Sequence, residues 1–224
     1  MGSSLPLGTI FGVHVRLDGT LLLLFVVFGF QGFDAGGLYG VVNALVFLVF
    51  LLVSIVLHEI GHAAAGLLFG LRPVEIALQF FGGYTRYAEP PRNPLEEAVV
   101  SLAGPLVNLA LAALLYVALA HGGGTALSAP TARLLDNLRY ANLILGIFNL
   151  LPAFPLDGGS FTRAILSLWL SRALARLIVA GLGLLLGVAL AVYAFTNGIT
   201  FTGVVGILLA LIAWQELTAA RAEL

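Results

Sequence analysis

The sequence predicts an all-α polytopic membrane protein with about six transmembrane helices and a small β-hairpin before the third. Its residues are 60% hydrophobic and only 9% charged, whereas soluble domains carry about 25% charged residues. So few charges cannot cover a surface that faces water. Apolar runs of about 17–25 residues recur along the chain, which is the length that crosses a hydrocarbon core. The net charge of −1 gives no electrostatic basis for binding nucleic acid.

Six apolar segments are predicted to cross the bilayer, all within one domain of 224 residues. They lie at about 19–33, 38–69, 95–120, 132–150, 172–196 and 199–220. The second segment rises about 48 Å as a helix, so it is longer than a core of about 30 Å requires. After the fourth segment, "DGGSFTRAILSLWL" favours a short amphipathic or re-entrant helix. In "GLGLLLG" at 181–187, the glycines favour close helix packing over a mobile gate.

The arginines predict the orientation of the chain. An even number of crossings places both termini on one side of the membrane. Eight of the ten arginines fall on that side, and two, Arg133 and Arg139, fall on the other. The positive-inside rule therefore predicts cytoplasmic termini. The start of the chain lacks the pattern of a removable signal peptide, and the compact form favours a prokaryotic cell membrane.

Residues 74–89, "VEIALQFFGGYTRYAE", interrupt the helical pattern before the third crossing. Two extended runs flank Gly82 and Gly83, which predicts a tight hairpin at this pair. An open strand edge cannot face lipid, because its backbone groups would have no partners. The hairpin is therefore expected at the cytoplasmic surface or beside a water-filled cavity.

The segment "HEIGH" at 58–62 places His58, Glu59 and His62 inside an apolar helix. Histidines four residues apart lie on one helix face, so both imidazoles can bind one metal ion. Glu59 is then suited to act as a general base toward water. Ionisable groups in a membrane helix cost at least about 2.5–3.5 kcal/mol each, so a functional site is favoured. The alternative is a buried polar network without metal.

The metal is predicted to be one zinc ion, which needs a third protein ligand at a catalytic site. The chain has no cysteine, and His14 and His121 are expected near the membrane interfaces. Asp157 is the best candidate, since two prolines break the helix before it and two glycines follow it. Broken backbone at membrane depth is tolerated where it lines a cavity. Glu216 is the second candidate.

Together these segments resemble the site-2 protease family of intramembrane zinc metalloproteases. "HEIGH" resembles the first metal motif of the family, and "NLLPAFPLDGG" at 149–159 resembles the segment that carries the third zinc ligand. "SLAGPLVN" at 101–108 resembles a small-residue stretch between them, and "FFGGYTRY" resembles a hairpin. The segments occur in the order of the family across nearly the whole chain.

The resemblance implies proteolysis within the membrane. The substrates would be single transmembrane segments, often already trimmed by another protease. His58, His62 and Asp157 map to zinc ligands, and Glu59 maps to the general base. Asn149 maps to an asparagine near the scissile carbonyl, or else it braces the broken helix.

Three hairpin residues, Gly82, Gly83 and Tyr84, map to the segment that holds extended substrate, although the glycines are equally compatible with a plain turn. Ser160 departs from the family, which often has arginine there, and Arg163 follows a turn later. The chain leaves no room for an inserted PDZ domain, and the C-terminal CBS pair that relatives with this six-helix plan often carry is either absent or truncated. The alternatives are a divalent-metal transporter, a catalytically silent family member, or a membrane metalloprotease of another type that uses a downstream glutamate.

Overall fold

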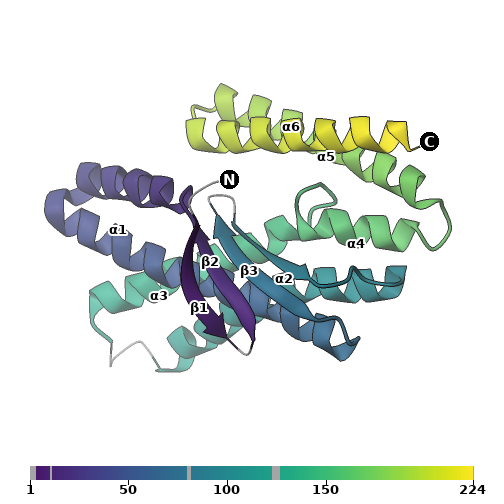
Figure 1. Ribbon diagram of the computed structural model, residues 1–224. Helices are drawn as coiled ribbons and strands as arrows, with labels where there is room; N and C mark the ends of the chain where they lie inside the picture. The colour runs from purple at the N-terminus through teal and green to yellow at the C-terminus, as the bar shows by residue number, and fades with distance from the viewer. Residues whose placement is uncertain (1–3, 11, 80–81, 123–126, 224) are drawn as a thin grey trace. The chain divides into compact units, whose positions relative to one another are not determined.

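The computed structural model describes residues 4–10, 12–79, 82–122 and 127–223 (Figure 1). Its elements are β1 (Ser4–Ile10), β2 (Val13–Asp18), α1 (Leu21–Leu68), β3 (Pro73–Gln79), β4 (Gly82–Tyr87), α2 (Pro94–Gly122), α3 (Ala129–Asn149), α4 (Asp157–Leu166), α5 (Arg172–Thr196) and α6 (Thr200–Ala222). They form two compact units. The first unit contains Met1–Pro90 and Leu106–Gly146, and the second contains Pro91–Pro105 and Ile147–Leu224.

Element α1 consists of two helices that meet at a sharp kink. Gly36 and Gly37 have non-helical backbone angles inside it, and the ribbon doubles back on itself there (Figure 1). A Cβ atom added to Gly40 would lie within 3.0 Å of the carbonyl carbon of Gly32. Residues eight apart in a continuous helix are separated by about 12 Å, so the chain must reverse between them. The two separate segments predicted at 19–33 and 38–69 agree with this reversal.

The helices follow the predicted segments closely, and α5 covers the predicted range 172–196. Four helices among the described residues, α1, α2, α5 and α6, are long and apolar enough to cross a membrane. Helix α3 is not among them, since it carries Arg133, Asp136 and Arg139 within 21 residues. The six-helix plan therefore fits, but the composition of α3 alone does not predict a crossing. Helix α4 is the short helix expected after the fourth segment.

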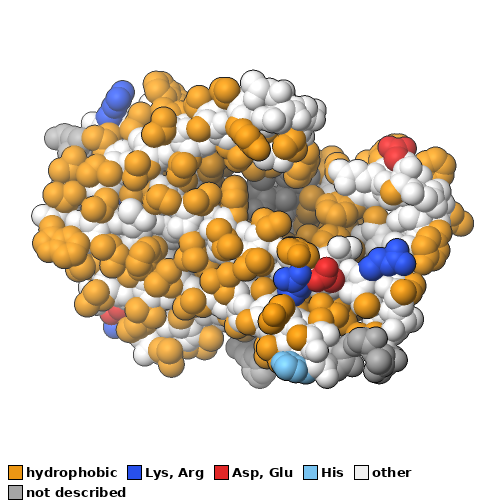
Figure 2. All heavy atoms as spheres, turned by 180° about the vertical axis from the view of Figure 1, so that it is seen from behind, with side chains coloured by type: hydrophobic (Ala, Val, Ile, Leu, Met, Phe, Trp, Pro, Cys, Tyr) orange, Lys and Arg blue, Asp and Glu red, His pale blue; other side chains and the backbone are white. Residues whose placement is uncertain are grey.

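Apolar side chains are abundant on the surface. Figure 2 shows hydrophobic side chains across most of the visible face, with few charged groups among them. Phe30, Leu38 and Leu185 are each at least 67% exposed. Apolar surface on this scale marks a contact with lipid or protein rather than water. The exposure agrees with the prediction of an integral membrane protein.

The small sheet has four strands, where the sequence predicted only a hairpin. Its order is β1-β2-β3-β4, with β1 and β2 antiparallel, β2 and β3 parallel, and β3 and β4 antiparallel. The parallel pair sets His14 opposite Glu75. This pairing joins β2 and β3, which lie on either side of α1 in the sequence, so no local sequence signal predicts it. The prediction of an all-α chain with one hairpin is corrected to a helical chain with a mixed four-stranded sheet.

The predicted position of the hairpin turn is also wrong by two residues. Gly82 pairs with Gln79, and Gly83 pairs with Leu78, so both glycines lie within β4. The connection falls at residues 80–81, outside the described residues. Gly82 has a φ of +126°, which disfavours other residues there. The sheet packs on the end of α1 through Val13, Ala63 and Ile76.

In the second unit, α5 and α6 pack through small residues. A Cβ atom on Gly187 would lie 2.6 Å from the backbone nitrogen of Ala210, and one on Gly206 would lie 2.6 Å from that of Ala191. Only glycine allows backbones to approach so closely. The prediction of close packing is therefore confirmed at Gly187. A buried cluster joins Phe154 to this helix pair through Val179 and Ala180 of α5 and Leu217 of α6.

Candidate metal centre

His58, Glu59 and His62 occupy one turn of α1 in the first unit. All three side chains are buried, with exposed fractions of 6%, 3% and 6%. Their potential ligand atoms lie within 4.8 Å of one another. The other two histidines are elsewhere, with His14 in β2 and His121 in the last turn of α2. The predicted histidine and glutamate cluster is therefore present as a buried group.

The two imidazoles fit a shared metal ion. Their Nε2 atoms lie 3.1 Å apart, and the rings meet edge to face with an interplanar angle of 79°. Two nitrogen ligands at about 2.0–2.1 Å in tetrahedral geometry are separated by about 3.3 Å. The spacing and the imidazole nitrogen donors therefore suit zinc.

Glu59 is held by strand β4. The hydroxyl of Thr85 donates to Oε2 of Glu59 at 2.8 Å and lies 3.1 Å from its backbone oxygen. Gly83 faces the same carboxylate, because an added Cβ atom would lie 2.6 Å from Oε1 of Glu59. The absence of a side chain at Gly83 therefore leaves the room that Glu59 occupies. The sequence predicted Gly83 as a site residue but gave no signal for Thr85.

Tyr87 ties the same strand to the second histidine. Its hydroxyl donates to the backbone oxygen of His62 at 2.6 Å. Gly66 receives the ring, since an added Cβ atom would lie 2.4 Å from the Tyr87 ring. Burial raises the pKa of the Tyr87 hydroxyl, and the negative charge of Glu59 raises it further. The hydroxyl therefore stays protonated and keeps donating throughout the physiological range.

Tyr84 belongs to a separate polar cluster on the sheet. Its hydroxyl donates to Oε1 of Glu75 at 3.1 Å, and Arg86 donates to Oε2 of Glu75 at 2.6 Å. The bond from Arg86 lowers the pKa of the Glu75 carboxyl, so Glu75 is ionised near neutral pH. Tyr84 as a whole remains 43% exposed. Its predicted contact with substrate remains a prediction.

Asp157 and Asn149 belong to the second unit. Asp157 is the first residue of α4, and Asn149 is the last residue of α3. Gly158 and Gly159 are required by packing, because added Cβ atoms would lie 2.3 Å from the carbonyl carbon of Leu150 and 2.7 Å from that of Ala153. The two glycines thus allow the first turn of α4 to pack closely against the backbone of Leu150 and Ala153. The roles of Asp157 as third ligand and of Asn149 at the carbonyl remain predictions.

Arg163 anchors the helix that begins with Asp157. Its Nε donates to Oε1 of Glu97 at 3.0 Å, and Arg172 donates to Oε2 of Glu97 at 2.6 Å. Glu97 is buried, and the guanidinium of Arg163 lies 5.4 Å from the ring centroid of Phe154. The two arginines therefore hold one buried carboxylate, which joins α4 to the first turn of α2. The sequence showed Arg163 as an arginine one turn after Ser160, where the family pattern departs, and gave no signal for its bond to Glu97.

The comparison with protein families decides the assignment. The protein-family model described as "Peptidase family M50" matches residues 46–132 and 117–194, which is more than half of the chain. The chain belongs to peptidase family M50. Both metal motifs lie inside the matched ranges, with "HEIGH" in the first and Asp157 in the second.

Individual relatives agree with membership in M50. The chain is 34% identical over 168 residues to "Zinc metalloprotease MJ0392" of Methanocaldococcus jannaschii, covering 75% of this chain and 47% of that protein. It is 32% identical over 240 residues to "Putative zinc metalloprotease Rip3" of Mycobacterium tuberculosis, covering all of this chain and 59% of that protein. The M50 chain thus spans about half the length of the curated relatives it matches.

A solved structure has the same fold. The "Site-2 Protease from Methanocaldococcus jannaschii" aligns with a TM-score of 0.73 and 29% identity. The alignment covers 96% of this chain and 95% of that one. The resemblance to site-2 proteases predicted from the sequence motifs is therefore confirmed.

Proposed function

We propose that the chain is an intramembrane zinc metalloprotease that hydrolyses peptide bonds within or near single transmembrane segments. One zinc ion is held by His58, His62 and Asp157. The observation that carries the proposal is the buried turn of α1, where two Nε2 atoms lie 3.1 Å apart beside Glu59 in an apolar helix. Membership in M50 and the names of the relatives as zinc metalloproteases support it.

Glu59 acts as the general base. When bound, zinc supplies a Lewis acid that polarises a carbonyl and lowers the pKa of water. Glu59 takes a proton from the attacking water and delivers it to the leaving amine. Thr85 orients the carboxylate through the 2.8 Å hydrogen bond to Oε2. Asn149 donates to the scissile carbonyl oxygen as negative charge develops there.

The substrate binds as an added strand along β4. This strand is an edge of the sheet, and the unpaired backbone groups of an edge strand can pair with an extended peptide. Gly82, Gly83 and Tyr84 lie on β4, which also carries the hydrogen bond to Glu59. A membrane helix must unwind before it can pair in this way, so helix-weakening residues near the scissile bond favour cleavage. Prior trimming by another protease would release such a segment.

The protein is proposed to act as one domain of residues 1–224 in a prokaryotic cell membrane, with both termini in the cytoplasm. The arginine distribution supports this orientation. Accessible cysteines introduced after Ser3 and after Glu223 would test it. Labelling of both by a membrane-impermeant reagent only after the cells are permeabilised supports cytoplasmic termini, and labelling in intact cells contradicts them.

Cleavage of a defined substrate tests the activity. The purified full chain, loaded with zinc in liposomes, is expected to cut a single-span substrate inside its apolar segment, as shown by product masses. A chelator should abolish the cut, and added zinc should restore it. If no span in a panel is cut while the liposomes take up divalent metal, the chain is a transporter. If neither cleavage nor uptake occurs, the chain is either catalytically silent or selective for spans outside the panel.

The third ligand is tested by comparing Asp157→Ala with Glu216→Ala. Asp157→Ala is expected to lower both zinc content and cleavage, because it removes one of three protein ligands. Glu216→Ala should keep both, since Glu216 already accepts from Nε of Arg176 at 2.8 Å. Zinc per chain is measured by atomic absorption after gel filtration. The reverse pattern would assign the ligand to Glu216 and favour the other type of membrane metalloprotease.

A further inference from the structure

Four buried polar side chains form a continuous path to the metal site within the first unit. Ser54 and His58 come from α1, Asn108 from α2 and Asn142 from α3. Their exposed fractions are 7%, 6%, 1% and 1%. Buried amides in apolar helices are costly unless they are hydrogen-bonded. Three helices therefore contribute polar side chains to one buried path. Of the four side chains, His58 alone belongs to the metal-binding motif.

Two backbone carbonyl oxygens determine which atoms donate and which accept along this path. The hydroxyl of Ser54 donates to the carbonyl oxygen of Phe50 at 3.2 Å. The amide nitrogen of Asn142 donates to the carbonyl oxygen of Leu138 at 2.9 Å and to Oγ of Ser54 at 3.1 Å. A backbone carbonyl only accepts, so the carbonyl of Leu138 fixes which end of the Asn142 amide carries the nitrogen. The oxygen of that amide must then face the next residue.

The orientation of the Asn142 amide in turn determines which ring nitrogen of His58 carries the proton. Nδ2 of Asn108 donates to Oδ1 of Asn142 at 2.9 Å, which leaves Oδ1 of Asn108 facing Nδ1 of His58 at 2.5 Å. An amide oxygen cannot donate, so Nδ1 of His58 must carry the proton. The lone pair of the neutral ring then lies on Nε2, the atom that is 3.1 Å from Nε2 of His62.

We propose that Asn108 and Asn142 are positioning residues that fix His58 as the Nδ1–H tautomer and aim its Nε2 at the metal. This inference rests on the proposed role of His58 as a zinc ligand. The opposite tautomer would set the Nδ1 lone pair against the Asn108 oxygen and direct an N–H at the metal. Outer partners of ligating histidines fix ring orientation and tautomer in this way. Asn142 acts one step further out by orienting Asn108.

Zinc affinity of the full chain tests the proposal directly. Asn108→Leu removes the acceptor and is expected to weaken zinc binding by about 10–100-fold, the usual loss for such a partner. Asn108→Asp keeps an acceptor opposite Nδ1 but loses the donor to Oδ1 of Asn142, so it should bind zinc more tightly than Asn108→Leu. Asn142→Leu should give an intermediate loss. Each dissociation constant is measured by competition with a chromogenic chelator in detergent solution.

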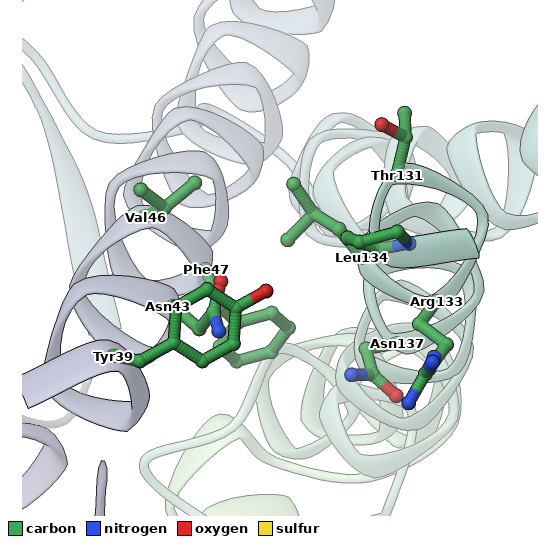
Figure 3. A pocket seen from close by; sticks show the side chains of 9 residues that line it. Tyr39, Asn43, Val46, Phe47, Thr131, Arg133, Leu134 and Asn137 are labelled. Atoms are coloured by element: carbon green, nitrogen blue, oxygen red, sulfur yellow. The ribbon is translucent and has the colours of Figure 1, made fainter. Parts of the chain in front are cut away.

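Asn137→Leu is the matched control on α3. Asn137 lies five residues before Asn142 on α3. Its side chain is among those that line a cleft between α1 and α3 (Figure 3). It is exposed, and its replacement should leave zinc affinity unchanged. Nitrogen-15 spectra of histidine-labelled protein give a second readout, with His58→Ala used for assignment. The His58 signal should show a proton on Nδ1 in wild type and in Asn108→Asp.

The outcomes separate this inference from the proposed function. Wild-type affinity in Asn108→Leu, equal losses in Asn108→Leu and Asn108→Asp, or a proton on Nε2 of His58 in the metal-free wild type would each overturn the positioning role. If His58→Ala binds zinc as tightly as wild type, the proposed metal site itself is wrong. Asn108→Asp keeps the test valid if the leucine variant fails to fold.

Discussion

Glu59→Gln is expected to slow cleavage of an intramembrane substrate by about 10²–10⁴-fold, the usual contribution of a general base. Glutamine keeps the size of the side chain, and its oxygen can still accept from Thr85, which lies 2.8 Å from Oε2 of Glu59. It cannot accept a proton from water. Zinc affinity should therefore stay at the wild-type value while turnover falls, as measured by chelator competition and by product formation under saturating substrate.

Glu75→Gln is the control for this experiment. Glu75 is also a buried carboxylate, but its oxygens are occupied by Arg86 and Tyr84 on the sheet. Its replacement should leave turnover close to wild type. Wild-type turnover in Glu59→Gln would place the base elsewhere. Loss of zinc from Glu59→Gln would instead make Glu59 a ligand.

Gly83→Ala is expected to lower turnover by about 10²-fold, the size of loss that a displacement of about 1 Å causes at a reacting group. The added Cβ atom would lie 2.6 Å from Oε1 and 2.7 Å from Cγ of Glu59. Both atoms belong to a side chain that can rotate, so Glu59 moves more readily than the backbone. The variant should therefore remain folded and bind zinc, while its carboxylate sits away from the attacking water.

Gly181→Ala provides a matched control, because an added Cβ atom there meets nothing within 4 Å. It should cleave at the wild-type rate. Thr85→Val is a second test of how the Glu59 carboxylate is positioned, since it removes the hydroxyl that donates to Glu59. Wild-type turnover in Gly83→Ala would show that β4 does not confine Glu59 in the working protein. A rise in KM with unchanged kcat would show that Gly83 acts through substrate binding and not through the position of Glu59.

Helix positions could be predicted from the sequence because their signals are local. Helix α5 begins after Ser171, whose hydroxyl accepts from the backbone nitrogen of Leu174 at 3.3 Å, and it ends before Gly198. The caps, Ser171 and Asn197, directly flank the 25 residues of the apolar run. The kink in α1 was also visible, as glycines between two apolar segments. Such features depend on neighbours along the chain, so single-sequence reasoning identifies them.

The sheet could not be predicted in full because its pairing is not local. Strand β2 pairs in parallel with β3 across the whole of α1, and β2 has only six residues. Its alternation of apolar and polar side chains is too short to distinguish a strand from an extended N-terminus. The misplaced turn has a similar cause, since the pairing of Gly82 with Gln79 is fixed by the register of the whole ladder.

By itself, the sequence determined the membrane class, the helix positions and the metal turn. His58 and His62 lie on one helix face because they are four residues apart, whatever surrounds them. The tertiary structure alone decided the surroundings of that turn. Thr85 reaches Glu59 across 26 residues, and Asn108 reaches His58 across 50. Such contacts depend on how β4 and α2 pack against α1, and packing of distant segments leaves no periodic signal in the sequence.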